Sequence, residues 1–310
     1  MSATLALRRA TRGFTLVELM IALTISLFVV GALIVVVLGA SSSSAARERN
    51  SEIQTNGRYA LEQIKRDLQH SGFLGISGLF FPDDPITPGI SVTNTCDTAT
   101  IGKLSQRVFG ADGNPFAATC IPAANYLRGD VLVIRGLDPT VVAAPYASNR
   151  VYYRSAYEGG QPFKGPTPPD FTGTNKQPPY IDHLLNETIY YISPYTESAA
   201  ESPQVPALYR LRLENGPTMR AELIATGVEH LQVRYGVFQT NDTVRYLNAS
   251  EMGSGDWDLV RSVQVFILMR STSTETDYVN NTSYAMGDTT YTVNDAYPRL
   301  LLTAVVQLRN

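Results

Sequence analysis

Gly13, Phe14 and Glu18 are the residues whose types and spacing could support chemistry on the chain itself. Glu18 lies at the start of an apolar run that carries no charge from Leu19 to Ala40. A carboxylate at such a depth in a bilayer costs about 2.5–3.5 kcal/mol and therefore needs a cationic partner. Cleavage between Gly13 and Phe14 would create a new α-amine about one helical turn from Glu18. The spacing therefore predicts an ion pair between this amine and Glu18, in the same chain or in a neighbouring one.

The stretch from Arg12 to Ala40 is the element that would position these residues. About 20 apolar residues, each rising about 1.5 Å, match a hydrocarbon core about 30 Å thick. Arg8 and Arg9 also precede the run, and no acidic residue occurs among residues 1–17. By the positive-inside rule, this asymmetry places the amino terminus in the cytoplasm and the chain from about residue 45 outside it.

The run Gly13-Phe14-Thr15-Leu16-Val17-Glu18 resembles the processing site of type IV prepilins and type II secretion pseudopilins. The resemblance implies that a membrane prepilin peptidase cuts between Gly13 and Phe14, methylates the new amine of Phe14, and leaves Glu18 as a subunit-docking residue. An uncleaved signal anchor is one alternative, but an anchor has no use for Glu18. A cleaved secretory signal is another, but the span is long and no small-x-small site follows it.

A second helical pattern follows the apolar run, and one stripe of its residues recurs at three- and four-residue spacing. The stripe consists of Ile53, Gly57, Ala60, Leu61, Ile64 and Leu68. We expect one continuous helix from about Phe14 to about His70, stopped near Gly72, with the stripe packed on a sheet. The expected organisation is a leader (1–13), a transmembrane helix half (14–40), an amphipathic helix half (41–72) and a periplasmic head (73–310).

The remaining pattern predicts short strands at 130–137, 150–154, 188–192, 207–213, 220–225, 228–239, 259–269 and 299–308. The Pro- and Gly-rich segment 157–182 is expected to be irregular, and the polar segment 271–296 to be a long surface excursion. Consecutive strands with tight turns indicate an antiparallel sheet. The fold class expected is therefore α+β and type IV pilin-like, with a long amino-terminal helix packed on an antiparallel sheet.

Three further segments narrow the resemblance: Asn56-Gly57-Arg58-Tyr59-Ala60-Leu61, Arg66-Asp67-Leu68 and the glycine-flanked Phe73. With V-E-H-L-Q-V-R-Y-G near the carboxy terminus, they resemble the PilW group of minor pilins. This implies a minor pilin that primes pilus assembly and lies at the tip beneath an adhesin. Its partners would be other minor pilins, the major pilin, the prepilin peptidase and the inner-membrane assembly platform. After extraction from the inner membrane, the protein would be found in the pilus fibre.

Cys96 and Cys120 fall in the region outside the cytoplasm, where oxidising conditions favour a disulfide over two free thiols. His70, His183 and His230 have no metal-like spacing and are expected to be surface residues. No nucleophile or phosphate-binding motif is present, so we expect neither enzyme activity nor a cofactor or metal. The net charge of −3 does not suggest a nucleic-acid partner.

Two other functions remain open. A type II secretion pseudopilin of the J kind shares the leader, helix and sheet, although such chains are generally shorter. A membrane-anchored periplasmic enzyme or binding protein would keep its leader uncleaved, so the amino terminus of the membrane form distinguishes it from a pilin.

Overall fold

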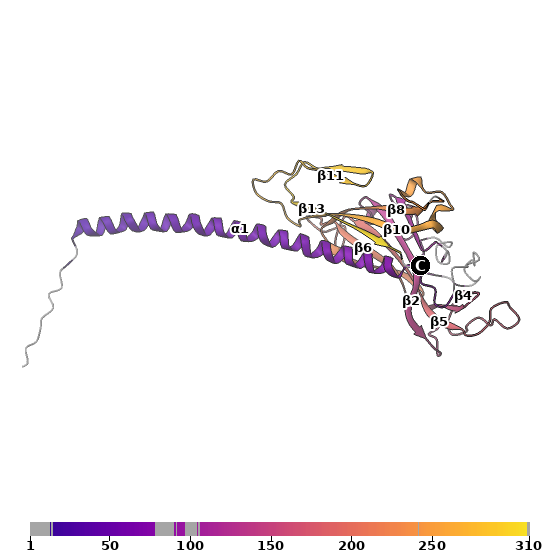
Figure 1. Ribbon diagram of the computed structural model, residues 1–310. Helices are drawn as coiled ribbons and strands as arrows, with labels where there is room; N and C mark the ends of the chain where they lie inside the picture. The colour runs from indigo at the N-terminus through magenta and orange to yellow at the C-terminus, as the bar shows by residue number, and fades with distance from the viewer. Residues whose placement is uncertain are drawn as a thin grey trace, which may run out of the picture. The chain divides into compact units, whose positions relative to one another are not determined.

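The computed structural model describes residues 13, 15–77, 90, 92–96, 104, 106–240 and 242–308 (Figure 1). The predicted leader residues 1–12 and the predicted amino-terminal Phe14 lie outside the described residues. The chain divides into two compact units, Met1–Arg49 and Asn50–Asn310. We refer to the second, which contains all the strands, as the β unit and describe each unit by itself.

Helix α1 runs from Leu16 to His70 and contains the long apolar segment expected from the sequence. It is long and apolar enough to cross a membrane, with a mean hydropathy of 3.0 over its most apolar window, none of which is buried. The large apolar side chains from Leu16 to Leu38 are between 51% and 81% exposed. The helix ends where predicted, because Gly72 has a φ of +71°, which glycine adopts without steric cost.

The β unit contains two antiparallel sheets and a two-stranded hairpin. The larger sheet has the order β1-β2-β5-β3-β4, with β6 also paired to β5, and β7 to β6. Its strands are β1 (Val108–Asp112), β2 (Asp130–Val142), β3 (Val151–Ala156), β4 (Gly159–Lys164), β5 (Ile181–Ser193), β6 (Ala207–Glu214) and β7 (Thr218–Thr226). The smaller sheet has the order β13-β10-β8-β9, formed by β13 (Arg299–Gln307), β10 (Val260–Arg270), β8 (Val228–Phe238) and β9 (Val244–Leu247). The hairpin pairs β11 (Ser283–Met286) with β12 (Thr289–Thr292), and three short 3-10 helices are η1 (Ala123–Asn125), η2 (Ala249–Glu251) and η3 (Asp256–Leu259).

This architecture confirms the α+β pilin-like fold, but two segments expected to lack strands contain them. Segment 157–182 holds β4, where Pro162 is tolerated because β4 is an edge strand and needs few backbone donors. Segment 271–296 holds the β11–β12 hairpin, whose turn uses Gly287 at a φ of +69°. Both were missed because their residues are mostly polar, glycine or proline and give no apolar alternation. The short strands β1 and β9 were also not predicted.

The apolar stripe of α1 lies in the main core of the β unit, as expected. Ile53, Ala60, Ile64 and Leu68 are each at most 4% exposed, and Leu61 packs against them from a partly buried position. The stripe contacts residues from both sheets, and not from a single sheet as we expected. The chain passes from one sheet to the other at Gly227, which lies between β7 and β8 and has a φ of +78°.

Polar contacts also fasten α1 to the larger sheet. The Tyr190 hydroxyl donates to Asp67 Oδ2 at 2.6 Å, and Arg210 Nη1 lies 3.3 Å from the same oxygen. Asn56 Nδ2 donates to Thr226 Oγ1 at 3.0 Å on β7. On the side of the smaller sheet, Gly57 leaves room for close packing, since an added Cβ would lie 2.5 Å from Leu302. Burial on both sides therefore fixes the rotation of this half of the helix.

Candidate functional site

The amino-terminal end of α1 is closed by reciprocal hydrogen bonds between Thr15 and Glu18. The Glu18 N–H donates to Thr15 Oγ1 at 3.2 Å, and the Thr15 N–H donates to Glu18 Oε2 at 3.1 Å. This arrangement is a capping box, which satisfies backbone donors that have no partner inside the helix. Sequence reasoning missed this role, although a threonine followed three residues later by a glutamate before an apolar run is its usual signature.

Glu18 therefore has a local structural task in addition to the predicted pairing with an α-amine. Its carboxylate is exposed and lies in the first turn, where negative charge interacts favourably with the helix dipole. Gly13 is exposed, and apart from its chain neighbours no atom of the described residues lies within 4 Å of the position where a Cβ would be.

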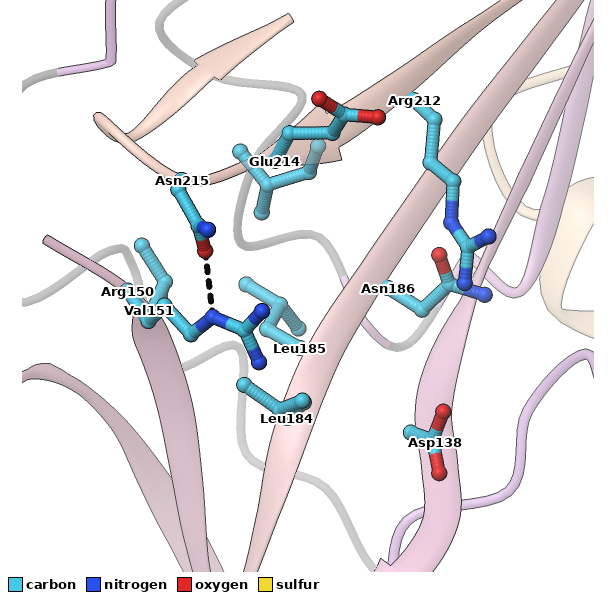
Figure 2. A pocket seen from close by; sticks show the side chains of 10 residues that line it. Asp138, Arg150, Val151, Leu184, Leu185, Asn186, Arg212, Glu214 and Asn215 are labelled. Atoms are coloured by element: carbon cyan, nitrogen blue, oxygen red, sulfur yellow. Dashed lines mark hydrogen bonds between the residues drawn. The ribbon is translucent and has the colours of Figure 1, made fainter. Parts of the chain in front are cut away.

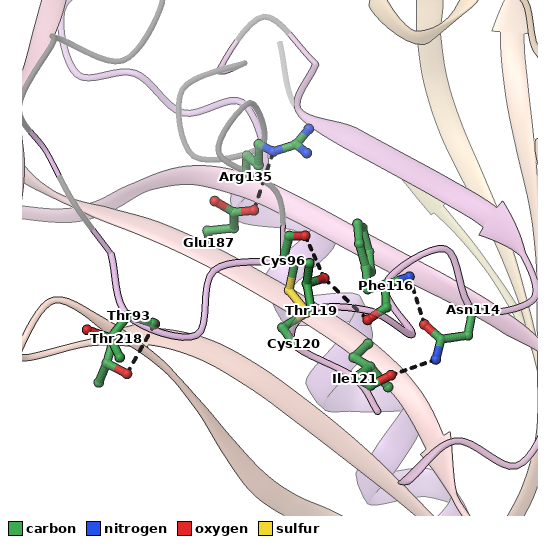
Figure 3. Close-up of a disulfide and its surroundings, with 10 residues drawn as sticks. All are labelled: Thr93, Cys96, Asn114, Phe116, Thr119, Cys120, Ile121, Arg135, Glu187 and Thr218. Carbon is green, nitrogen blue, oxygen red and sulfur yellow. Dashed lines mark hydrogen bonds and ion pairs between the residues drawn. A yellow bond between two sulfur atoms is a disulfide. The ribbon is translucent and has the colours of Figure 1, made fainter. Parts of the chain in front are cut away.

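Cys96 and Cys120 form the predicted disulfide, which closes a segment with a sequence separation of 24 (Figure 3). Hydrogen bonds fix the described residues around it: Thr119 Oγ1 donates to the Cys96 carbonyl at 2.7 Å, and Asn114 Nδ2 donates to the Ile121 carbonyl at 2.8 Å. Cys96 and Ile121 belong to an apolar cluster that includes residues of β2, β5, β6 and β7. The disulfide therefore fastens this segment to the larger sheet.

Two of the three histidines are buried, so the expectation that all three are surface residues was wrong. His70 is exposed, but His183 and His230 are only 3% and 7% exposed. His183 packs edge-on against the ring of Phe73, and one of its ring nitrogens lies 2.9 Å from the Asp138 carbonyl. No group of three or more potential ligand side chains that could hold a metal ion occurs among the residues that the structure describes.

His230 lies on β8 and was expected at the surface, but the β11–β12 hairpin packs against its side of the strand. The ring of Tyr291 on β12 lies 5.4 Å from the His230 ring, and Leu268 is its cross-strand neighbour. Burial lowers the pKa of His230. The prediction that His230 is exposed was wrong because the alternation of apolar and polar residues along β8 carries no information about a hairpin that comes much later in the chain.

A polar cleft of about 390 Å³ opens in the larger sheet (Figure 2). Its walls include two arginines, Arg150 and Arg212, and two amides, Asn186 and Asn215. No sequence motif indicated it, because its residues come from separate strands. Its walls also carry two carboxylates, Asp138 and Glu214.

Two segments of the chain match known families. Residues 8–34 match the prokaryotic N-terminal methylation motif, which covers Gly13, Phe14 and Glu18. Residues 189–310 match the type IV pilus-assembly protein W family, from within β5 to the end of the chain. Neither a curated protein nor a solved structure matches the chain. The two family matches, with the long apolar helix and the antiparallel sheets, support a PilW-type minor pilin of the type IV pilus.

Proposed function

We propose that this minor pilin is made as a precursor, is cut between Gly13 and Phe14 and methylated on Phe14, and then primes the assembly of pilus fibres. The observation that carries the proposal is the apolar half of α1, whose large side chains from Leu16 to Leu38 are all exposed in the chain by itself. Burying a single Leu, Val or Phe side chain stabilises a structure by about 1.5–3 kcal/mol. This surface therefore requires lipid before assembly and the helices of other subunits after it.

The proposed topology places the amino terminus in the cytoplasm and the β unit in the periplasm, and later in the fibre. Arg8, Arg9 and Arg12 on one side of the span support this orientation. The partners proposed are other minor pilins, the major pilin, the prepilin peptidase and the inner-membrane assembly platform. We place the subunit at the tip, beneath an adhesin, because a priming complex is extruded first. In this role the chain is a structural protein and not an enzyme.

Glu18 is proposed to pair with the Phe14 amine of an adjacent subunit in the fibre. Removing two charges from water offsets much of their attraction, so the pair sets the axial register more than it adds net stability. The capping box gives the carboxylate a hydrogen-bonded position in the chain before it meets this partner. Assembly would then exchange one set of interactions of Glu18 for another.

Mass spectrometry of the amino terminus tests the processing step directly. Protein isolated from membranes and from sheared fibres is expected to begin with a methylated Phe14. An intact Met1 in the membrane form, together with absence from the fibre fraction, would contradict the proposal and favour an anchored periplasmic protein. Recovery with a secretion pseudopilus, and not with pili, would favour the pseudopilin alternative, against which the PilW match already argues.

Two matched variants separate the proposed pairing of Glu18 from its capping role. Glu18→Gln keeps a side-chain acceptor for the capping box but removes the charge, whereas Thr15→Ala keeps the charge and removes a cap contributing about 1 kcal/mol. We expect Glu18→Gln to be cleaved normally but excluded from fibres, and Thr15→Ala to be incorporated at close to the normal level. Normal incorporation of Glu18→Gln would refute the pairing, and normal incorporation of Glu18→Gln together with loss of Thr15→Ala would assign Glu18 to helix capping alone.

A further inference from the structure

The polar cleft exists because β5 changes its pairing partner along one edge. β3 pairs with β5 from Ile181 to Leu184, and β6 pairs with it from Thr188 to Ser193. β3 and β6 therefore lie against different parts of β5, and the sheet opens between them. The outer side of this opening is bridged where the Gly216 N–H donates to the Asn149 carbonyl at 2.7 Å. The cleft is thus bounded by β3, β5 and β6 and by the hydrogen bond between Gly216 and Asn149.

The register places the polar residues of the cleft on one face of the sheet. Side chains alternate along a strand, so Leu184 and Asn186 share the face of Tyr190, which contacts α1. Arg212 lies directly opposite Thr188 and shares this face as well. The α1 end approaches the same place, because a Cβ on Gly136, the cross-strand partner of Asn186, would lie 2.9 Å from the His70 carbonyl oxygen. The cleft therefore opens beside the carboxy-terminal end of the helix.

The two arginines of the cleft keep their charge available for a ligand. Arg150 Nε donates to the side-chain oxygen of Asn215, a neutral group. Neither Arg150 nor Arg212 has a carboxylate oxygen within the 4.0 Å of an ion pair in the described part of the chain. Figure 2 shows the guanidinium group of Arg150 near Leu184 and Leu185, and that of Arg212 near Asn186.

Each of the two carboxylates of the cleft has a partner other than Arg150 and Arg212. Glu214 lies 3.5 Å from Arg220 Nη1, outside the lining. Asp138 Oδ1 accepts the Thr140 N–H at 2.8 Å. Burial raises the pKa of Asp138, but the hydrogen bonds from Thr140 and the charge of Arg212 outweigh it and hold this pKa below its ordinary value. Asp138 thus remains a charged acceptor at the rim.

We propose that this cleft binds an acidic sugar, a single ring that carries one carboxylate, such as a uronic or sialic acid unit of a surface polysaccharide. The carboxylate would receive charge-assisted hydrogen bonds from Arg150 and Arg212, whose planar guanidinium groups suit a carboxylate. Ring hydroxyls would bond to Asn186, Asn215 and the rim carboxylates, and the apolar face of the ring would lie on Leu184. The volume of about 390 Å³ falls within the usual range of small-ligand sites.

The lining also disfavours other ligands. A phosphate group carries more negative charge than one carboxylate and would be repelled by Asp138 and Glu214. A neutral sugar would leave the two guanidinium groups without an anionic partner. The ligand class that satisfies the cations, the amides and the carboxylates together is a hydroxylated monocarboxylate.

Titration calorimetry of the full chain in detergent tests the proposal with glucuronate and N-acetylneuraminate as probes. Glucose is the neutral control and inorganic phosphate the polyanion control. We expect at least one acidic sugar to bind, glucose to show no binding, and phosphate to bind at least tenfold more weakly. Arg212→Gln should weaken the acidic sugar about 10- to 100-fold, since a hydrogen bond to a charged group is lost. Arg212→Lys, which keeps the charge but not the planar fork, should fall between Arg212→Gln and the unchanged chain.

Arg245→Gln is the matched control. Arg245 is exposed on β9 of the other sheet, and its substitution changes the net charge by the same amount as Arg212→Gln. Its affinity should equal that of the unchanged chain, and all variants should retain the same unfolding midpoint. The proposal is overturned by absence of binding for both acidic sugars, by equal binding of glucose or phosphate, or by equal loss in Arg212→Gln and Arg245→Gln. The assay reads binding alone, so its outcome does not depend on cleavage or pilus assembly.

Discussion

Asp130 allows the packing between the two sheets of the β unit to be tested, because it is a buried acid with an unusual protonation equilibrium. It is 2% exposed at the start of β2, where Oδ2 accepts the Val233 N–H at 2.7 Å and Oδ1 accepts Gln232 Nε2 at 3.1 Å. Burial raises the pKa of Asp130 to about 8, with smaller contributions from the negative charges of Asp112 and Asp288, and the two hydrogen bonds oppose this only in part. Asp130 therefore links the two sheets as a neutral acid at neutral pH.

The sign of the resulting pH dependence follows from proton linkage. Between the ordinary pKa of 3.8 and about 8, the folded chain holds a proton on Asp130 that the unfolded chain releases. The free energy of unfolding must then fall as pH rises through this window. Asp130→Asn removes the titration and keeps a neutral group of the same shape. Each pH unit corresponds to about 1.4 kcal/mol, so the advantage of the variant should grow by about 4 kcal/mol between about pH 5 and pH 8.

Urea unfolding of the oxidised full chain in detergent, followed by tryptophan fluorescence at several pH values, measures this difference. Trp257 is the single tryptophan, is 5% exposed and contacts the rings of Tyr235 and Phe109 in the core. His230, whose pKa burial lowers, changes stability in the opposite direction as pH falls below about 6.5, but both chains carry it and the difference cancels it.

Asp288→Asn serves as the control for charge alone, because Asp288 is exposed and belongs to the same acidic surroundings. Asp288→Asn should reduce the pH dependence of the free energy of unfolding only slightly. The reasoning is refuted if the unfolding free energies of Asp130→Asn and the unchanged chain run parallel from pH 5 to pH 8.

Substitutions at three other places test the packing, the polar contacts and the disulfide of the β unit by the same unfolding assay. Gly57→Leu should lower the free energy of unfolding by about 2 kcal/mol through overpacking against Leu302. Gly57→Ala should be near neutral, because a gain of about 1 kcal/mol in helix propensity offsets the tighter contact. Equal effects of the two substitutions would contradict the close contact between Gly57 and Leu302. Tyr190→Phe should cost about 2 kcal/mol by removing a buried donor to Asp67, and an unchanged midpoint would show that this hydrogen bond contributes nothing. Replacing Cys96 and Cys120 by Ala should cost about 3.5 kcal/mol under oxidising conditions, with little difference from the unchanged chain once reductant is added.

The sequence was sufficient to predict those elements whose local pattern agrees with their tertiary environment. The stripe of α1 and the alternation of β8, β10 and β13 each mark a face that is buried in the structure. β4, β11 and β12 carry no such alternation, because their residues are mostly polar, glycine or proline. The division into two sheets was missed because only the course of the chain after Gly227 separates them.

A candidate site could be predicted from the sequence only where the residues that reveal it lie close together in the chain or have a chemistry that indicates their role. Cys96 and Cys120 could be paired from the chemistry of the compartment alone, and the structure confirms the bond. The capping role of Glu18 also has a local signature, Thr15 three residues before it, which we did not use. The burial of His230 has none, because the hairpin that covers it comes much later in the chain.

The cleft shows most clearly why some sites cannot be found from a sequence. β5 has 13 residues, whereas β3 has six and β6 has eight, so one long edge is shared by two shorter partners. An opening is required wherever two such partners leave the shared edge before they meet. The position of the cleft is thus a property of strand lengths and pairing, and not of any residue that lines it. It follows that Arg150 and Arg212 can be exchanged for other side chains while the opening remains, which would let related chains bind different ligands at one place in the fold.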